Sequence, residues 1–207
     1  MGSIFKNVSE FVNDINEDEV LLEIGSDRWE GSTAFFAELA HLHNSHLHTV
    51  DIQTDIGPRL EQIIPSPYNS CYTFYNTSGE AITSNWNKKI RVLYLDNFDW
   101  DWNIRVKSDM IAEQKVWYRE QGLKMNNINS QISHLTQAIN LTPWLTRRSI
   151  IAIDDTYLHN GTFTGKGGAV VPYLMMKGFD ILKINDHGLI MGCDFENVGD
   201  LEKIPVW

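Results

Sequence analysis

The sequence predicts an α/β domain, a three-layer sandwich around a mainly parallel sheet with an antiparallel hairpin at its C-terminal edge. Two observations support this prediction. Short apolar runs alternate with amphipathic stretches of helical spacing through most of the chain. One of the runs, SIIAIDDTY at 149–157, is almost wholly apolar in its first half, as is typical of a strand buried on both faces.

The composition favours one globular domain spanning 1–207. The 207 residues are 43% hydrophobic, and they contain no repeat, linker or low-complexity segment. A formal net charge of -10 argues against general binding to nucleic acid. Cys71 and Cys193 form no disulfide framework, and no apolar run reaches the roughly 18 residues of a membrane span. We therefore expect a cytoplasmic protein without a membrane partner, and the sequence leaves a homo-oligomer open.

The first half of the chain predicts an N-terminal helix and then alternating strands and helices. The helix lies within 1–17, where apolar residues recur at helical spacing from 3 to 15. Strands are expected at four apolar or aromatic runs, 19–25, 46–52, 71–79 and 90–100. Helices are expected between them at 32–43 and, broken by prolines, within 54–67.

The second half of the chain predicts an insertion outside the core and then the remaining core elements. Residues 101–130 are polar and irregularly charged, with a helix near 110–122, and we expect them to form a mobile or separately packed insertion that covers the acceptor site. The other expected elements are a helix at 130–145, a strand at 149–157, a glycine-rich loop at 159–168, a helix at 169–178 and the edge hairpin at 179–194.

The loop after the first strand predicts a ligand site. In such sheets ligands lie beyond the carboxyl ends of the strands. Gly25 and Gly31 would let the backbone approach a ligand, and the N–H groups opening the next helix at Ser32 and Thr33 favour an anion. Asp51 ends the following strand, at a position suited to a ribose diol. Together these features indicate a nucleoside-containing cofactor.

Two phosphate-binding motifs fit less well. GSDRWEG, at 25–31, lacks the middle glycine of a dinucleotide fingerprint. GTFTGKGG, at 161–168, has three residues where a P-loop has four, and Gly167 stands where a hydroxyl would bind magnesium. A nucleotide hydrolase is therefore the least favoured alternative.

Four segments in register resemble the motifs of class I S-adenosylmethionine-dependent methyltransferases. They are LLEIGSDRWEGST, HTVDI, LYLDNFDW and SIIAIDDTY, and the resemblance covers about 18–192. It is nearest to the small-molecule O-methyltransferases, whose first motif reads like E-x-G-x-x-x-G-G-S-T and whose fifth strand ends in Asp-Asp. The resemblance implies a Rossmann-like sheet, S-adenosylmethionine as cofactor and methyl transfer to a hydroxyl. The alternative is a binding module with the same fold and no transfer.

The resemblance also assigns cofactor contacts. It implies that Asp51 holds the ribose hydroxyls and that Ser78 neighbours adenine, and Asp96 is a further candidate for contact with the cofactor. The first loop is one residue longer than is usual in the family, which leaves the roles of Asp27 and Arg28 open; Arg28 would pair with the methionine carboxylate. The residues implied to cradle the methionine portion are Glu23, Gly25, Ser26, Asp27, Arg28, Gly31 and Ser32.

Asp96, Asp154 and Asp155 follow two strands expected near the sheet centre, so their carboxylates should gather at one edge. Such a cluster is costly unless a cation or a proton is shared among its members. One interpretation is a site for Mg²⁺ or another divalent cation, which would orient and acidify an acceptor hydroxyl. In the other, Asp96 contacts the cofactor amino group or caps a helix, while Asp154 and Asp155 only end a strand.

The general base and the acceptor are less closely defined. The family commonly has a His-Ser pair where this chain has Asn129 and Ser130. We therefore take two other residues as the candidate catalytic residues, Asp96 and His159, which lies in the loop beyond Asp155. His134 is a less favoured candidate. DNFDWDWN, at 96–103, combines carboxylates with aromatic rings that suit a sugar or other polyol as the small-molecule acceptor. Alternatively, Phe98, Trp100 and Trp102 pack the insertion onto the core.

Overall fold

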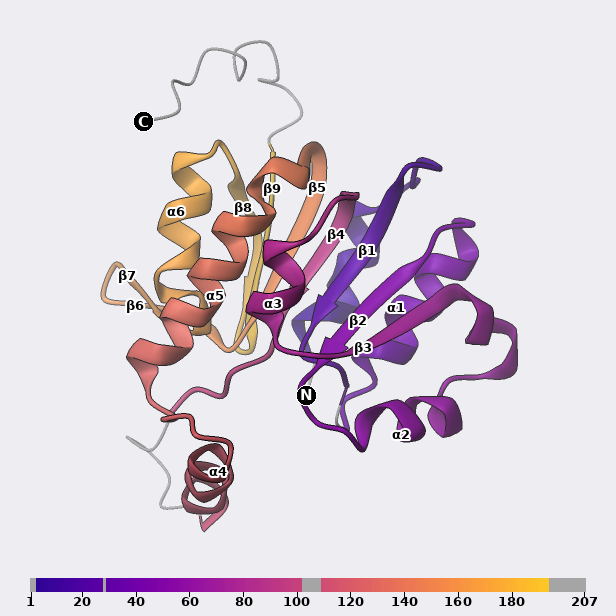
Figure 1. Cartoon of the computed structure of the whole chain (residues 1–207). Helices are drawn as coiled ribbons and strands as arrows, with labels where there is room; N and C mark the ends of the chain where they lie inside the picture. The colour runs from indigo at the N-terminus through magenta and orange to yellow at the C-terminus, as the bar shows by residue number, and fades with distance from the viewer. Residues whose placement is uncertain (1–2, 28, 102–108, 194–207) are drawn as a thin grey trace.

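The computed structural model describes residues 3–27, 29–101 and 109–193, and its centre is a seven-stranded sheet in the order β3-β2-β1-β4-β5-β9-β8 (Figure 1). The pairs from β3 to β5 are parallel, whereas β9 is antiparallel to both β5 and β8. These strands are β1 (Glu19–Ile24), β2 (Leu47–Asp51), β3 (Tyr72–Asn76), β4 (Lys89–Leu95), β5 (Leu145–Asp154), β8 (Asp180–Asn185) and β9 (Gly188–Gly192). The predicted three-layer, mainly parallel architecture with its antiparallel edge hairpin is confirmed.

Helices cover both faces of the sheet. They are α1 (Ser32–Leu42), α2 (Ile56–Ile63), α3 (Gly79–Ser84), α4 (Asp109–Glu120), α5 (Asn127–Leu141) and α6 (Val170–Met176). Apolar side chains of α3, α5 and α6 pack against one face, and those of α1 and α2 against the other. The central strands alternate their side chains between these two clusters, which explains their almost continuous apolar character. Within the described part of the chain, no helix has the length and apolar character of a membrane span.

The N-terminal segment differs from the predicted helix. It forms a 3-10 helix, Ile4–Phe11, rather than a longer α-helix. Ile4, Phe5 and Val8 are fully buried and belong to the same cluster as α1 and α2. The apolar positions were therefore recognised correctly, but they complete one face of the core instead of preceding it.

Two short elements were not predicted. α3 follows β3 directly, with the Ser78 hydroxyl accepting a hydrogen bond from the Ala81 N–H at 3.2 Å as its N-terminal cap. The expected glycine-rich loop is a hairpin of β6 (Thr156–His159) and β7 (Thr162–Gly165). Asn160 and Gly161 both have positive φ and form its two-residue turn. Asn-Gly is a preferred sequence for such turns, so the hairpin could have been predicted from the sequence.

The sheet reverses its order between β1 and β4, and Gly25 lies at this point. Its backbone φ is +96°, and an added Cβ would lie 2.6 Å from the Asn97 nitrogen and against the Asp96 carbonyl. The Asp96 N–H in turn donates to the Ile24 carbonyl at 2.8 Å. Close backbone contact thus joins the first loop to the end of β4, beside the position where ligands bind in such sheets.

We predict that Gly25→Ala lowers the free energy of unfolding by at least about 3 kcal/mol, because the methyl group meets backbone that has no room to move. Gly31→Ala is the matched control: Gly31 also has a positive φ, of +88°, but nothing lies within 4 Å of its added Cβ. It should cost only about 1 kcal/mol in backbone strain. Denaturant unfolding measures the loss of unfolding free energy in both variants. Equal losses in the two would contradict the close contact of Gly25 with the backbone after β4.

Candidate active site

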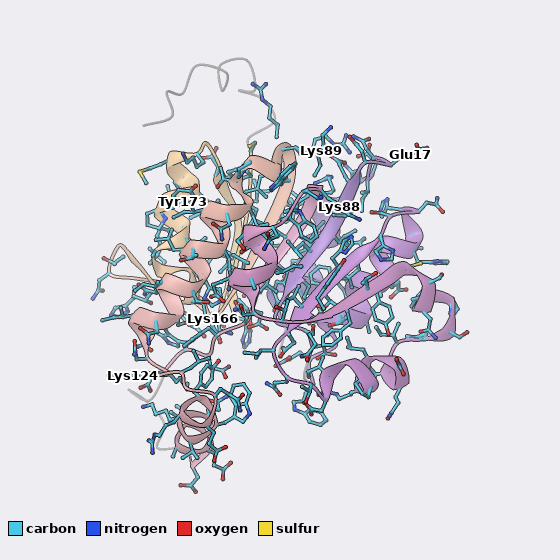
Figure 2. All side chains as sticks on the ribbon, viewed as in Figure 1. Glu17, Lys88, Lys89, Lys124, Lys166 and Tyr173 are labelled. Atoms are coloured by element: carbon cyan, nitrogen blue, oxygen red, sulfur yellow. The ribbon has the colours of Figure 1, made fainter. Side chains whose placement is uncertain are left out.

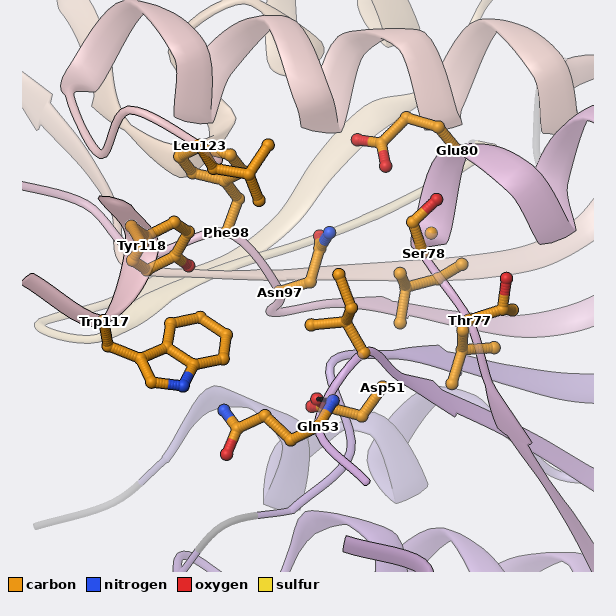
Figure 3. A pocket seen from close by; sticks show the side chains of 14 residues that line it. Asp51, Gln53, Thr77, Ser78, Glu80, Asn97, Phe98, Trp117, Tyr118 and Leu123 are labelled. Atoms are coloured by element: carbon orange, nitrogen blue, oxygen red, sulfur yellow. Dashed lines mark hydrogen bonds between the residues drawn. The ribbon is translucent and has the colours of Figure 1, made fainter. Parts of the chain in front are cut away.

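A pocket lies at the carboxyl ends of β1 to β4 (Figure 3). Asp51 from the end of β2, Ser78 after β3 and Asn97 after β4 line it, and Trp117 and Tyr118 of α4 stand across from them. Of the predicted cofactor residues, the structure therefore brings Asp51 and Ser78 into one cavity. This cavity lies where strand order reverses, as expected for a ligand site.

Polar groups in and beside the pocket are held in place by short local contacts. The buried Asp51 carboxylate accepts a hydrogen bond from the Gln53 N–H at 2.8 Å, which fixes its orientation at the end of β2. Among the described residues, the buried side-chain oxygens Asn97 Oδ1 and Asp27 Oδ1 have no hydrogen-bond partner. Buried oxygens normally find a donor, and Asn97 lines the pocket, so its Oδ1 favours a ligand that brings an N–H or O–H group.

The first loop is built around Glu23, which is fully buried beneath it. The Glu23 carboxylate accepts hydrogen bonds from the hydroxyls of Ser32 at 2.6 Å, Thr33 at 2.6 Å and Thr49 at 2.5 Å. Burial raises the pKa of Glu23 to about 8 against the opposing effect of these donors. Glu23 therefore joins β1, the first turn of α1 and β2.

Other predicted cofactor residues also support the loop from within. Ser26 shares a hydrogen bond with the Thr49 hydroxyl at 2.6 Å, and the Asp27 N–H donates to Thr33 Oγ1 at 2.8 Å. Gly31 precedes α1 in the left-handed conformation. Arg28 lies outside the described residues. The sequence did not indicate that Glu23 and Ser32 would bind each other, because they are nine positions apart and lie in different elements, β1 and α1.

The three predicted acidic residues do come together. Asp96 follows β4, Asp154 ends β5, and Asp155 comes next with a positive φ of 45°. One carboxylate oxygen from each can be chosen so that all three lie within 4.8 Å of one another. The expected gathering of acids at one edge of the sheet thus has a structural basis in the parallel pairing of β4 with β5.

A lysine that the sequence analysis did not select lies among these acids. Lys166 follows the β6–β7 hairpin and is buried at the carboxyl edge of the sheet (Figure 2). Its ammonium contacts Asp96 Oδ1 and lies 3.1 Å from Asp155 Oδ2. Because a cation already holds two of the three carboxylates, the group does not fit a divalent metal while Lys166 stays in place. The expected metal site has a different occupant.

The cluster changes the acidity of its members. Burial raises the pKa of Asp96 to about 6, although the Lys166 ammonium opposes the change. Burial, and then the charge of Asp96, raise the pKa of Asp154 to about 9, which favours the protonated form of this side chain. Burial would also raise the pKa of Asp155, but the Lys166 ammonium and the Tyr157 hydroxyl outweigh it and hold this pKa below its ordinary value.

The two candidate histidines lie in different surroundings. His159 is exposed at the tip of the hairpin, where its Nε2 contacts the Asn160 amide at 3.2 Å, and the structure does not bring it to the acidic cluster. His134 on α5 is fully buried, and its Nδ1 donates to the Ser130 carbonyl at 2.7 Å. Burial, followed by the nearby Lys166 charge, lowers the pKa of His134 to about 4. His134 is therefore neutral and lies nearer the site.

The segment after β4 holds α4 near the pocket. The Phe98 and Tyr118 rings lie 4.8 Å apart, and the Asp99 N–H donates to the Tyr118 hydroxyl at 2.7 Å. Lys115 pairs with Asp101 at 2.6 Å. Ile111, Tyr118 and Met125 form a small cluster distinct from the two clusters of the sheet, and Figure 1 shows α4 set apart from α3, α5 and α6.

This packing agrees with the alternative in which Phe98 holds the insertion on the core; Trp102 lies outside the described residues. The expected cover over 101–130 can be placed only in part, because 102–108 are not described. Trp117, Tyr118 and Leu123 line the pocket that also contains Asp51 and Ser78. The described part of the segment thus borders the expected nucleoside side.

Comparison with known proteins identifies the fold. No family model and no curated sequence matches the chain. A Clostridium thermocellum protein provisionally assigned as an rRNA methylase has a TM-score of 0.58 at 12% identity, covering 92% of this chain and 96% of that one. The TDP-rhamnose 3'-O-methyltransferase of calicheamicin biosynthesis has a TM-score of 0.55 at 14% identity, covering 91% and 76%. The chain has the class I methyltransferase fold.

A third similar structure contains the cofactor of this fold. The glycopeptide N-methyltransferase MtfA, in complex with S-adenosylmethionine, has a TM-score of 0.51 at 9% identity, covering 93% of each chain. The three neighbours share the fold of this chain and differ in the acceptors that their names give. A fold hosts many functions, so the chemistry has to be argued from the site.

Burial of Glu23 predicts a dependence of stability on pH. Its pKa rises from an ordinary 4.5 to about 8 in the folded state, so the folded protein binds the proton more tightly than the unfolded chain. Stability should therefore fall as pH rises from about 4.5 towards 8, by up to about 1.4 kcal/mol per unit. In Glu23→Gln this loss should be smaller, which denaturant unfolding at pH 5 and pH 8 will measure.

Glu10→Gln is the control for this measurement. Glu10 is exposed, and its hydrogen bond with Lys183 lowers its pKa, so it titrates below the pH range of the test. Its profile should run parallel to that of the unmodified protein from pH 5 to pH 8. If Glu23→Gln also runs parallel, Glu23 keeps its charge in the folded state and the prediction is wrong.

Proposed function

We propose that the protein is an S-adenosylmethionine-dependent methyltransferase that acts on a hydroxyl of a small molecule. The observation that carries this proposal is the pocket of Asp51, Ser78 and Asn97 at the carboxyl ends of β1 to β4. Its position on a class I methyltransferase fold and its polar groups support a nucleoside ligand.

Each part of the pocket has a role in this proposal. Asp51 accepts hydrogen bonds from the ribose hydroxyls, the segment of Thr77 and Ser78 borders adenine, and Asn97 Oδ1 accepts from a donor of the cofactor. The first loop begins at Gly25, against the backbone of Asp96, and in this proposal borders the methionine portion. The bound cofactor supplies a methyl group on a positively charged sulfur.

Asp96 is the proposed proton acceptor. Its pKa of about 6 makes it a stronger base than an ordinary aspartate, and it directly precedes Asn97, which lines the pocket. When bound, the cofactor would supply its methyl group to the acceptor oxygen, and its sulfur would keep the electron pair of the carbon–sulfur bond. The acceptor proton passes to the Asp96 carboxylate, so charge and atoms balance.

The charge of the chain supports a small acceptor. With a net charge of -10 and carboxylates concentrated beside the pocket, the protein would repel the phosphates of a ribosomal RNA. The sequence of 96–103 combines carboxylates with aromatic residues, among them Trp100, and this combination favours a sugar or another polyol, whose hydroxyls find acceptors while its apolar face stacks. A methyl-transfer assay over hydroxylated and amine acceptors separates O- from N-methylation and from binding without transfer.

The assigned role of Asp51 leads to a binding prediction. Asp51→Ala should weaken binding of S-adenosylhomocysteine, measured by isothermal titration calorimetry, by about 1.5–3 kcal/mol, because hydrogen bonds to a charged group are lost. Asp55→Ala is the matched control, since Asp55 is exposed at the start of α2 and its side chain caps no helix N–H. Equal affinities of the unmodified protein and Asp51→Ala would reject the assignment.

The position of α4 predicts that it closes on the cofactor. Its small separate cluster gives it little connection to the sheet, so amides of Asp109–Glu120 should exchange with deuterium faster than those of β1 and β4. S-adenosylhomocysteine should slow this exchange. Trp117→Ala should weaken binding by about 1–2 kcal/mol, whereas Val116→Ala on the same helix should not. Exchange in α4 that is unaffected by the ligand would contradict the cover.

A further inference from the structure

We propose that Lys166 is a built-in cation of the acceptor site and takes the place that a divalent metal would otherwise occupy among Asp96, Asp154 and Asp155. The ammonium contacts Asp96 Oδ1 and lies 3.1 Å from Asp155 Oδ2, and only 4% of its side chain is exposed. Three carboxylates that approach within 4.8 Å of one another need a positive charge or a proton. A covalently attached ammonium provides that charge.

The backbone holds Lys166 in this position. Across the base of the β6–β7 hairpin, the Lys166 N–H donates to the Asp155 carbonyl at 2.9 Å. The next residue, Gly167, donates its N–H to Thr156 Oγ1 at 3.0 Å. Both ends of the hairpin are thus tied together, and the start of the Lys166 side chain lies beside the acids that its ammonium contacts. An exposed pair such as Lys89 with Asp18, in which more than half of each side chain is accessible, has no comparable support.

A metal and the ammonium exclude one another at this site. Mg²⁺, Mn²⁺ and Ca²⁺ all require oxygen ligands, and here two of the three carboxylates already bind Lys166. A divalent ion bound by the remaining lone pairs would lie within a few ångströms of another buried positive charge. Coulomb repulsion at such a separation, in partly desolvated surroundings, strongly opposes its binding.

The ammonium also orients Asp96. Lys166 contacts Asp96 Oδ1, and the Tyr94 hydroxyl donates to Asp96 Oδ2 at 3.2 Å, so each oxygen of this carboxylate has its own partner. If Asp96 receives the acceptor proton, a role that rests on the proposed function, Lys166 is its positioning residue. The exclusion of metal does not depend on that function.

Binding of Mn²⁺, followed by electron paramagnetic resonance as loss of the free-ion signal, tests the proposal without cofactor or acceptor. The unmodified protein should bind no stoichiometric Mn²⁺ at about 100 μM, an ordinary concentration for a carboxylate site. Lys166→Ala, which removes the charge and leaves space, should bind one equivalent at least about tenfold more tightly. Asp155→Asn in that background should abolish the gain. Lys89→Ala, which removes an exposed lysine paired with Asp18, should behave like the unmodified protein.

Further variants keep the result interpretable. Lys166→Arg retains a cation and should exclude Mn²⁺, whereas Lys166→Met removes the charge while filling the space, and thermal unfolding shows whether each variant folds. One equivalent of Mn²⁺ on the unmodified protein, lost in Asp155→Asn, would overturn the proposal even if every Lys166 variant failed to fold. Absence of Mn²⁺ binding to a folded Lys166→Ala would overturn it as well.

Metal dependence of the reaction separates this proposal from the proposed function. Methyl transfer by the unmodified protein should be unchanged after chelation with EDTA, and Lys166→Arg should keep more activity than Lys166→Met. Activity that EDTA removes and Mg²⁺ restores would overturn the inference about Lys166 while leaving the methyltransferase intact. Failure to bind S-adenosylhomocysteine would overturn the function and leave the Mn²⁺ result standing.

Discussion

The buried contact of the Lys166 ammonium with Asp96 and Asp155 is the interaction on which the site depends. It joins the end of β4 and the residue that follows β5 to the base of the hairpin. Removing one partner of such a group leaves an uncompensated charge in partly dry surroundings, which is far more costly than losing a surface ion pair. The acids can therefore remain concentrated beside the pocket because the chain supplies its own counter-charge.

Buried polar side chains also hold the first loop in place. Glu23 was expected to border the cofactor, but it lies beneath the loop and binds the hydroxyls of Ser32, Thr33 and Thr49. Hydrogen bonds in dry surroundings fix the backbone more firmly than exposed ones would. In addition, the Gly25 backbone lies directly against the backbone of Asp96 and Asn97, where the segment after β4 begins. The loop and the acidic cluster are consequently held at a defined separation before any ligand binds.

The opposite wall of the pocket is built differently. α4 packs through a small aromatic and aliphatic cluster on the chain that leaves β4, with Phe98 against Tyr118 and the ion pair of Lys115 with Asp101. Few apolar contacts join it to the sheet, so its local stability is expected to be low. The pocket thus combines a wall of strand ends with a helix whose apolar cluster is separate from those of the sheet.

The sequence by itself determined which residues stand at the strand ends. The apolar run before each of Asp51, Asp96 and Asp154 specifies a buried strand, and parallel strands present their carboxyl ends at one edge, so these positions follow from local pattern and the architecture it implies.

The tertiary structure decided which positively charged side chain contacts the acids at the ends of β4 and β5. Lys166 is 70 residues from Asp96, and it reaches the cluster only because the Asn160–Gly161 turn folds an apparent loop into a hairpin that returns the chain to Asp155. The tertiary structure also decided that His134 is buried and His159 exposed. Burial depends on which elements pack against one another, and the spacing of apolar residues along the sequence does not specify that packing.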